Sequence, residues 1–188
     1  MPRYLIIPGL GNSGPAHWQS LWENSLPNAA RVEQREWDRP LRDEWVATLQ
    51  RHVENEAGRV VLIGHSLACA LIAHWAGRYP AASVQAALLV APSDVDSPLH
   101  TPEESRDFAP MPLARLPFPA VVIASRDDPY IAPARAAAFA AAWGAEFVDC
   151  GAIGHVNGAS NLGEWPFGKE VLDRLVGSTD GRETVSSP

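Results

Sequence analysis

Three residues that lie far apart in the chain have the types needed for nucleophilic catalysis at a carbonyl group: Ser66, Asp128 and His155. A serine hydroxyl is a weak nucleophile at neutral pH, so it needs a base within hydrogen-bond distance. A carboxylate beside the base fixes its tautomer and stabilises its cation. The order serine, acid, histidine is one in which such sets occur. These residues predict hydrolysis of a small ester, thioester or amide through an acyl-enzyme intermediate, with carboxylesterase-like activity favoured.

Ser66 lies where an expected strand turns into an expected helix. The β-branched run before it is typical of a buried strand, and the alanine-rich run after it is typical of a helix. Residues 64–68 read Gly-His-Ser-Leu-Ala, which departs from the Gly-x-Ser-x-Gly nucleophile elbow only at Ala68. A serine in this place is also a common N-cap, so the pentapeptide alone leaves a purely structural role open.

The acid and the base each follow a further apolar run. Because the carboxyl ends of parallel strands lie at one edge of a sheet, where ligands bind, we expect these residues to meet there. We take Asp128, next to a proline, as the acid, with Asp127 in a supporting position and Asp94 as a third choice. The Asp-Pro pair also suits a simple turn, and His155 also suits an exposed loop.

Stabilisation of the oxyanion needs two N–H donors near the attacked carbonyl. The amide of Leu67, directly after the serine, is expected to be one of them. The other is expected from the glycine-rich loop after the first strand, with Leu10 preferred and Gly11 next. The candidates for lining the substrate pocket are Gly11, Asn12, His65 and Trp165.

The same loop supports a competing interpretation. Gly9, Gly11 and Gly14 match the G-x-G-x-x-G fingerprint of dinucleotide-binding folds, and Glu36 stands where a ribose-binding acid could lie. The alternative function is therefore an NAD(P)-dependent oxidoreductase. Pro15 argues against it, because proline is tolerated at the first position of a helix and not deeper, which keeps the glycines outside the first turn. A non-catalytic binding scaffold is a further alternative.

The elements that must position these residues alternate along the chain. In one helical stretch Leu41, Trp45, Leu49 and Val53 recur every four residues, whereas the strand-like runs are continuously apolar. This alternation predicts a six-stranded parallel sheet of order 2-1-3-4-5-6 with helices on both faces. Strands are expected near 4–8, 31–36, 59–64, 84–91, 119–125 and 145–150, and helices near 15–25, 41–56, 66–78, 134–143 and 167–176.

The domain organisation is expected to be simple. Residues 1–176 are expected to form one α/β domain. Residues 92–118 are rich in proline and are expected to form a long loop over the sheet, where they could cover a substrate. Residues 177–188 lack apolar periodicity and are expected to be a disordered tail.

Composition limits the partners. The 188 residues carry a formal net charge of −7, which argues against binding to nucleic acid or to an anionic membrane. The first apolar run is too short for a signal peptide, and two cysteines are too few for a disulfide scaffold, so we expect a cytoplasmic protein. No metal-ligand spacing is found, and no cofactor is expected. The expected partner is a small-molecule substrate, and protein partners are left open.

Several of these segments together carry a family resemblance. They are Leu5-Ile6-Ile7-Pro8-Gly9, His17-Trp18, Gly64-His65-Ser66-Leu67, the run from Ser125 to Pro133, and Gly154-His155. The chain resembles the small single-domain serine hydrolases typified by retinoblastoma-binding protein nine and bacterial YdeN-like proteins. The resemblance implies a compact α/β-hydrolase fold without a large lid domain, with Ser66 as nucleophile, His155 as base and Asp128 as acid. Pro8 and Ala68 depart from the residues that many hydrolases carry there.

Overall fold

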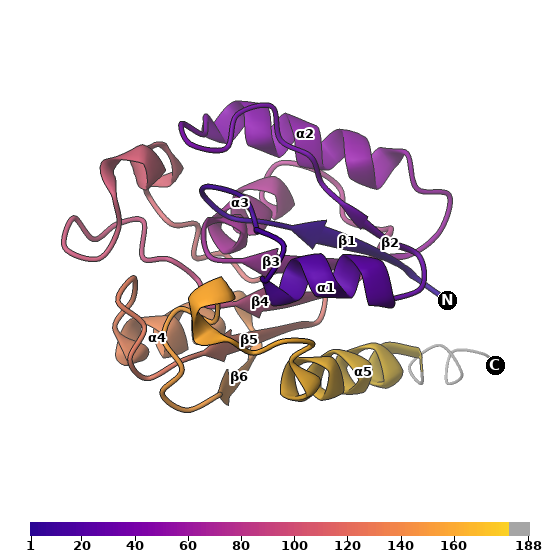
Figure 1. The fold of residues 1–188 in the computed structure, drawn as a ribbon. Helices are drawn as coiled ribbons and strands as arrows, with labels where there is room; N and C mark the ends of the chain where they lie inside the picture. Colours follow the sequence, from indigo (N-terminus) through magenta and orange to yellow (C-terminus); the bar gives the residue numbers. More distant parts are fainter. Residues whose placement is uncertain (181–188) are drawn as a thin grey trace.

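A parallel sheet forms the centre of the molecule, with helices on both faces (Figure 1). The computed structural model describes residues 1–180. Every pair of neighbouring strands is parallel, in the order β2-β1-β3-β4-β5-β6, which confirms the predicted topology. The strands are β1 (Arg3–Ile7), β2 (Ala29–Arg31), β3 (Val60–His65), β4 (Val84–Val90), β5 (Ala120–Ala124) and β6 (Glu146–Asp149).

The helices divide into two layers. Side chains of α1 and α5 pack against one face of the sheet, and side chains of α2, α3 and α4 pack against the other. Two short 3₁₀ helices, η1 and η2, lie in the long connections. The bounds are α1 (Trp18–Ser25), α2 (Arg42–Glu54), α3 (Leu67–Ala76), η1 (Glu103–Phe108), α4 (Pro133–Trp143), η2 (Gly158–Ser160) and α5 (Pro166–Asp180).

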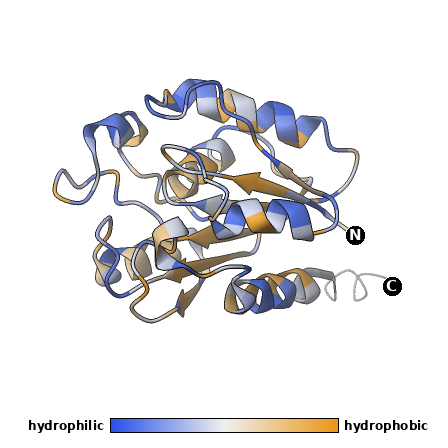
Figure 2. Ribbon diagram, viewed as in Figure 1, coloured by the Kyte–Doolittle hydropathy of each residue, from blue (hydrophilic) through white to orange (hydrophobic). Residues whose placement is uncertain are grey.

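Strand β1 shows why the strands are apolar without interruption. Successive side chains of a strand point to opposite faces. Leu5 and Ile7 therefore pack with α2 and α3, whereas Ile6 packs with the tryptophans of α1 and with α5. Since both faces are covered, neither set of alternate positions tolerates polar residues. Figure 2 shows the result as strands coloured hydrophobic between helices with mixed colouring.

Helix α1 begins later than the sequence predicts. The prediction placed its start near Pro15, but residues 15–17 form turns and the helix begins at Trp18. The ring of His17 caps it by accepting a hydrogen bond from the amide of Gln19 at 3.1 Å. Because His17 supplies an acceptor for this amide, the helix begins directly after His17 rather than at Pro15.

Strand β2 is shorter and lies earlier than the predicted 31–36. Only Ala29, Ala30 and Arg31 pair with β1, because β2 is an edge strand and the chain leaves the sheet just after Val32 donates to the carbonyl of Ile6. Glu36, the acid of the dinucleotide interpretation, therefore lies beyond the strand rather than near its end.

Two further expectations concern the chain between β4 and β5 and the C-terminal end. Residues 92–118 are mostly loop, as predicted, but contain η1. Helix α5 continues through residues 177–180, which the prediction assigned to a disordered tail. The rest of that predicted tail, 181–188, lies outside the described residues. Over residues 1–180, no helix has the combination of length and hydropathy needed to cross a membrane.

Candidate active site

Ser66 occupies the sharp turn between β3 and α3. Its backbone has φ 59° and ψ −121°, a conformation that L-residues rarely adopt and that persists only where the surroundings hold it. Gly64 makes the turn possible: a Cβ there would lie 2.6 Å from Cδ1 of Ile72 and 3.5 Å from Cβ of Ala68. Because position 64 has no side chain, the strand and helix approach closely even with Ala68 in place of the usual glycine.

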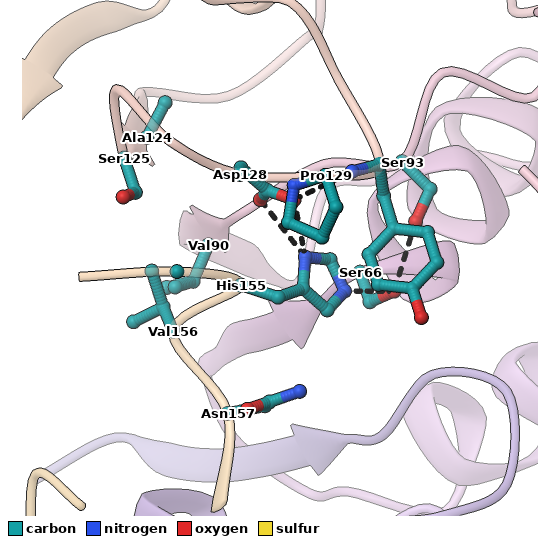
Figure 3. Close-up of polar contacts among 12 residues, drawn as sticks. Ser66, Val90, Ser93, Ala124, Ser125, Asp128, Pro129, His155, Val156 and Asn157 are labelled. Atoms are coloured by element: carbon teal, nitrogen blue, oxygen red, sulfur yellow. Dashed lines mark hydrogen bonds and ion pairs between the residues drawn. The ribbon is translucent and has the colours of Figure 1, made fainter. Parts of the chain in front are cut away.

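Three side chains form a continuous hydrogen-bonded chain (Figure 3). Nε2 of His155 lies 2.8 Å from Oγ of Ser66, and Nδ1 lies 2.8 and 2.9 Å from the two carboxylate oxygens of Asp128. A carboxylate only accepts, so Nδ1 carries the hydrogen and Nε2 of the neutral ring accepts from the serine. The side chain of Asp128 is 0% exposed, and the amide of Tyr130 donates to it at 2.9 Å.

The two other acid candidates have different partners. Oδ1 of Asp127 accepts from the hydroxyl of Ser125 at 2.7 Å and from the amide of Gly154 at 2.8 Å. These bonds lower the pKa of Asp127 and tie the β5 loop to the loop that carries the histidine. Asp94 pairs instead with Arg135 of α4 at 3.3 Å. The structure therefore brings only Asp128 into contact with His155.

A second serine contacts the hydroxyl of Ser66. Oγ of Ser93, in the loop after β4, lies 2.9 Å from Oγ of Ser66. Since the single hydrogen of Ser66 is directed to His155, Ser93 is the donor in this bond. The sequence analysis missed this residue, although its position after a strand at the same sheet edge was a usable signal.

Two backbone amides near Ser66 have free hydrogens. Among residues 1–180, the N–H groups of Leu10 and Leu67 have no acceptor. The amide of Gly11, the second choice for this role, donates to the carbonyl of Trp37 at 2.9 Å and is engaged there. Gly9 lets this loop approach Ser66, because a Cβ at Gly9 would lie 2.9 Å from the serine Cβ.

Two further histidines pack beside His155. The ring centroids of His65 and His155 are 4.9 Å apart, and those of His17 and His65 are 4.7 Å apart. Nε2 of His65 donates to the main-chain carbonyl of His155 at 2.9 Å, which anchors that loop. Burial, followed by the neighbouring His155, lowers the pKa of His17 to about 4 and that of His65 well below its ordinary value. Both rings are therefore neutral at pH 7.

A pocket of about 400 Å³ opens over Ser66 and His155. Of the predicted lining residues, Asn12 and His65 lie in its wall, whereas Gly11 and Trp165 do not. The ring of Trp165 is 4% exposed and packs with Trp18 at a centroid distance of 5.0 Å, in the core beneath α1 and α5. An aromatic side chain gains more from burial in that core than from a partly open wall, so the sequence prediction for Trp165 was wrong.

Several wall residues were not identified from sequence. Tyr130 stacks obliquely on His155 with ring centroids 4.4 Å apart. Asn157, two residues after the histidine, lines the same pocket as His155. Their closeness in sequence to Asp128 and His155 was the only available signal. The wall also includes His17, Ser93, Pro102 and Ser105.

The glycine-rich loop does not open a helix in the manner of a dinucleotide site. Gly14 and the start of α1 at Trp18 are separated by the turns at 15–17. The loop instead forms part of the pocket wall through Leu10, Asn12 and Gly14.

Comparisons with known proteins agree with this arrangement. The family model described as serine hydrolase matches residues 4–174. Among solved structures, a protein described as a YdeN-like hydrolase from Pectobacterium atrosepticum is 30% identical, with a TM-score of 0.84 over 95% of this chain and 92% of that one. No curated protein matches the chain.

Two more distant structures show likeness of fold alone. The ydeN gene product of B. subtilis is 17% identical, with a TM-score of 0.76 over 94% of this chain and 100% of that one. Est1E from Butyrivibrio proteoclasticus is 11% identical, with a TM-score of 0.67 over 97% and 88% of the two chains. Since the family match runs from β1 into α5, the chain belongs to the serine hydrolase family.

Proposed function

We propose that this protein is a carboxylesterase-like enzyme that cleaves small esters, thioesters or amides through an acyl-enzyme on Ser66. The observation that carries the proposal is the 2.8 Å contact between Nε2 of His155 and Oγ of Ser66, continued at 2.8 Å to the buried carboxylate of Asp128. These distances allow proton transfer from the serine to the histidine without movement of either side chain.

The reaction would proceed in two halves. Oγ of Ser66 attacks the carbonyl carbon while its proton passes to Nε2 of His155, and Asp128 stabilises the imidazolium that forms. The amides of Leu67 and Leu10 receive the oxyanion. The bond to the leaving group breaks, and the leaving group takes the proton from Nε2. Water then gives a proton to Nε2 and attacks the acyl carbon, and the serine oxygen leaves with that proton.

The neighbouring histidines favour this cycle by remaining neutral. An additional cation within about 5 Å of His155 would raise the free energy of the imidazolium, since like charges repel strongly in a partly buried site. His65 and His17 pack in a row beside it, and burial lowers the pKa of both. They therefore fill space next to the base without opposing its protonation.

The pocket supports a small uncharged substrate. Its volume of about 400 Å³ lies toward the small end of ligand pockets. Leu10, Pro15, Ala16, Pro102 and Tyr130 give it apolar surface, and none of the residues 1–180 that line it is Lys, Arg, Asp or Glu. A short acyl or aryl group fits these properties.

A fluorophosphonate probe tests the proposal directly. We expect one covalent adduct at Ser66 by mass spectrometry, absent in Ser66→Ala and strongly slowed in His155→Ala. Either substitution should reduce the kcat for p-nitrophenyl esters by about 10⁶-fold, leaving the rate that binding and the oxyanion donors support. Ser178→Ala, on α5 away from the pocket, is the matched control and should behave as the parent protein.

The alternatives predict other outcomes. A folded protein that shows neither adduct nor ester hydrolysis would overturn the proposal in favour of a binding scaffold. Absence of the adduct together with stabilisation against heat by NAD(H) or NADP(H) would favour an oxidoreductase.

A further inference from the structure

Three side chains in one part of the pocket wall share an unusual hydrogen-bond state. Asn12, His17 and Asn157 all line the pocket that contains Ser66. In each, the atom able to accept a hydrogen bond is already engaged by the protein, while an N–H group is left without an acceptor among residues 1–180. We call these three residues the donor subsite.

Asn157 is fixed by the short helix that follows it. Its Oδ1 accepts from the amide of Ala159 at 3.0 Å and so caps η2. Because Oδ1 faces the amide of Ala159, the side-chain nitrogen lies at the opposite end of the amide group. In Figure 3 this nitrogen is turned away from its own main chain, toward the side of the site on which Ser66 lies.

Asn12 is fixed by two donors. Its Oδ1 accepts from the amide of Ser13 at 2.7 Å and from the guanidinium of Arg31 at 2.7 Å. Two donors on one atom identify it as the oxygen, so the nitrogen is the atom left over. Arg31 also pairs with Glu23 at 2.8 Å, so its charge is balanced behind the pocket wall rather than presented to a ligand.

His17 adds a donor of the same kind. Its Nδ1 accepts from the amide of Gln19, which places the hydrogen of the neutral ring on Nε2. Nε2 is buried and has no hydrogen-bond partner in the described range 1–180, and the residue as a whole is 6% exposed. A buried donor without an acceptor is unfavourable, and such groups in native proteins call for an explanation.

We propose that the donor subsite binds an uncharged oxygen of the substrate, such as a ketone, amide or ether oxygen, in addition to the carbonyl that reacts at Ser66. Each of the three groups can only donate, which selects an acceptor and disfavours an ammonium or a purely alkyl group. Within the described part of the chain no Lys or Arg lines the pocket, which favours a neutral oxygen over a carboxylate. This inference rests on the proposed hydrolase function.

Matched esters test recognition of a second oxygen separately from ester hydrolysis itself. The p-nitrophenyl esters of pentanoic acid and 4-oxopentanoic acid differ by one ketone in the acyl half, and a second pair of pentanoate esters places the ketone in the alcohol half. We expect kcat/KM to be about tenfold higher for the ketone member of at least one pair, because a site that donates to an oxygen discriminates against an analogue that lacks it.

Three substitutions keep the engaged acceptor and remove the donor. They are Asn157→Asp, Asn12→Asp and His17→Asp, the last of which keeps an oxygen near the position of Nδ1 and has no N–H group. Each should lower the ketone-to-alkyl ratio of kcat/KM by about three- to tenfold. Asn161→Asp adds the same negative charge near Asn157 but lies outside the pocket lining, so it should leave the ratio unchanged.

The outcomes distinguish failure of this inference from failure of the proposed function. If Ser66 reacts with the fluorophosphonate and the pentanoate is hydrolysed, but neither ketone ester is preferred, the donor subsite is not a substrate site and the hydrolase remains. If a preference exists but survives all three substitutions, or falls equally in Asn161→Asp, the inference is also wrong. If Ser66 does not react, the proposed function itself fails.

Discussion

The proposed reacting groups come from the carboxyl ends of β3, β5 and β6, whereas the proposed donor subsite comes from the turns before α1 and after His155. In the first region each polar group is satisfied by another: Ser66 by His155 and Ser93, and His155 by Asp128. In the second region each side chain keeps a donor that has no acceptor among the residues the structure describes. In the proposed mechanism Ser66 reacts in the geometry it already has, whereas the proposed donor subsite would gain further hydrogen bonds from an oxygen of the substrate.

The same difference appears in how the two regions are held. Strand ends in the buried sheet fix the reacting groups, and Asp127 ties two of their loops together. Two members of the donor subsite are held as local caps, His17 on α1 and Asn157 on η2, and Asn12 is held by Ser13 and Arg31. A substitution in the first region should therefore change rate, and one in the second should change selectivity or stability.

The largest predicted effect separates two adjacent aspartates. Asp128→Asn should reduce kcat by about 10⁴-fold, because an amide in that place no longer fixes the tautomer or stabilises the cation of His155. Asp127→Asn keeps an oxygen that can accept from Ser125 and Gly154, so its loss should be less than about tenfold. Steady-state hydrolysis of p-nitrophenyl butanoate, with circular dichroism as a check on folding, measures both. A larger loss in Asp127→Asn would transfer the role of the acid to that residue.

The next effect concerns the approach of the glycine-rich loop to Ser66. Gly9→Ala places a methyl group 2.9 Å from the serine Cβ and from the carbonyl of His65, so the loop that carries the amide of Leu10 must move away. Loss of one oxyanion donor costs about 10²-fold or more in kcat. Gly58→Ala, where a Cβ meets nothing within 4 Å, is the control. Equal activity of the two variants would exclude Leu10 as a donor.

The meeting of Ser66, Asp128 and His155 at one sheet edge could be predicted from the sequence for a physical reason. Apolar runs mark buried strands, parallel connection places their carboxyl ends together, and Ser66, Asp128 and His155 each follow such a run. The strand order followed from the same alternation of elements.

The pocket wall was less predictable because its chemistry depends on individual atoms. Whether Leu10 or Gly11 has a free amide depends on a hydrogen bond to Trp37, which brings together distant parts of the chain. Ser93 reaches Ser66 only through the path of its loop, in which Ala91 has φ 48°. The sequence left a pocket position open for Trp165, and the packing of α1 and α5 places it in the core.

The donor subsite should also affect stability in acid. Free histidine titrates near 6.5, whereas burial lowers the pKa of His17 to about 4 in the folded protein. Between these values the unfolded chain binds a proton that the folded protein does not, so stability falls as pH falls. His17→Asn should reduce the loss of unfolding free energy between pH 7 and pH 5 by about 2 kcal/mol. Urea unfolding at both pH values measures it; an unchanged difference would contradict the neutral, buried state of the ring.

The smallest effect tests whether Ser93 belongs to the reacting region. Ser93→Ala removes the donor on the nucleophile oxygen and should slow phosphonylation of Ser66 about tenfold, the value of one good hydrogen bond. Deacylation should change less, because the oxygen is then part of an ester and accepts weakly. Ser93→Thr keeps the hydroxyl and should restore the rate, and Ser97→Ala is the control. Equal slowing of both steps would show instead that Ser93 only supports the loop. The proposed reacting region would then consist of Ser66, His155 and Asp128 alone.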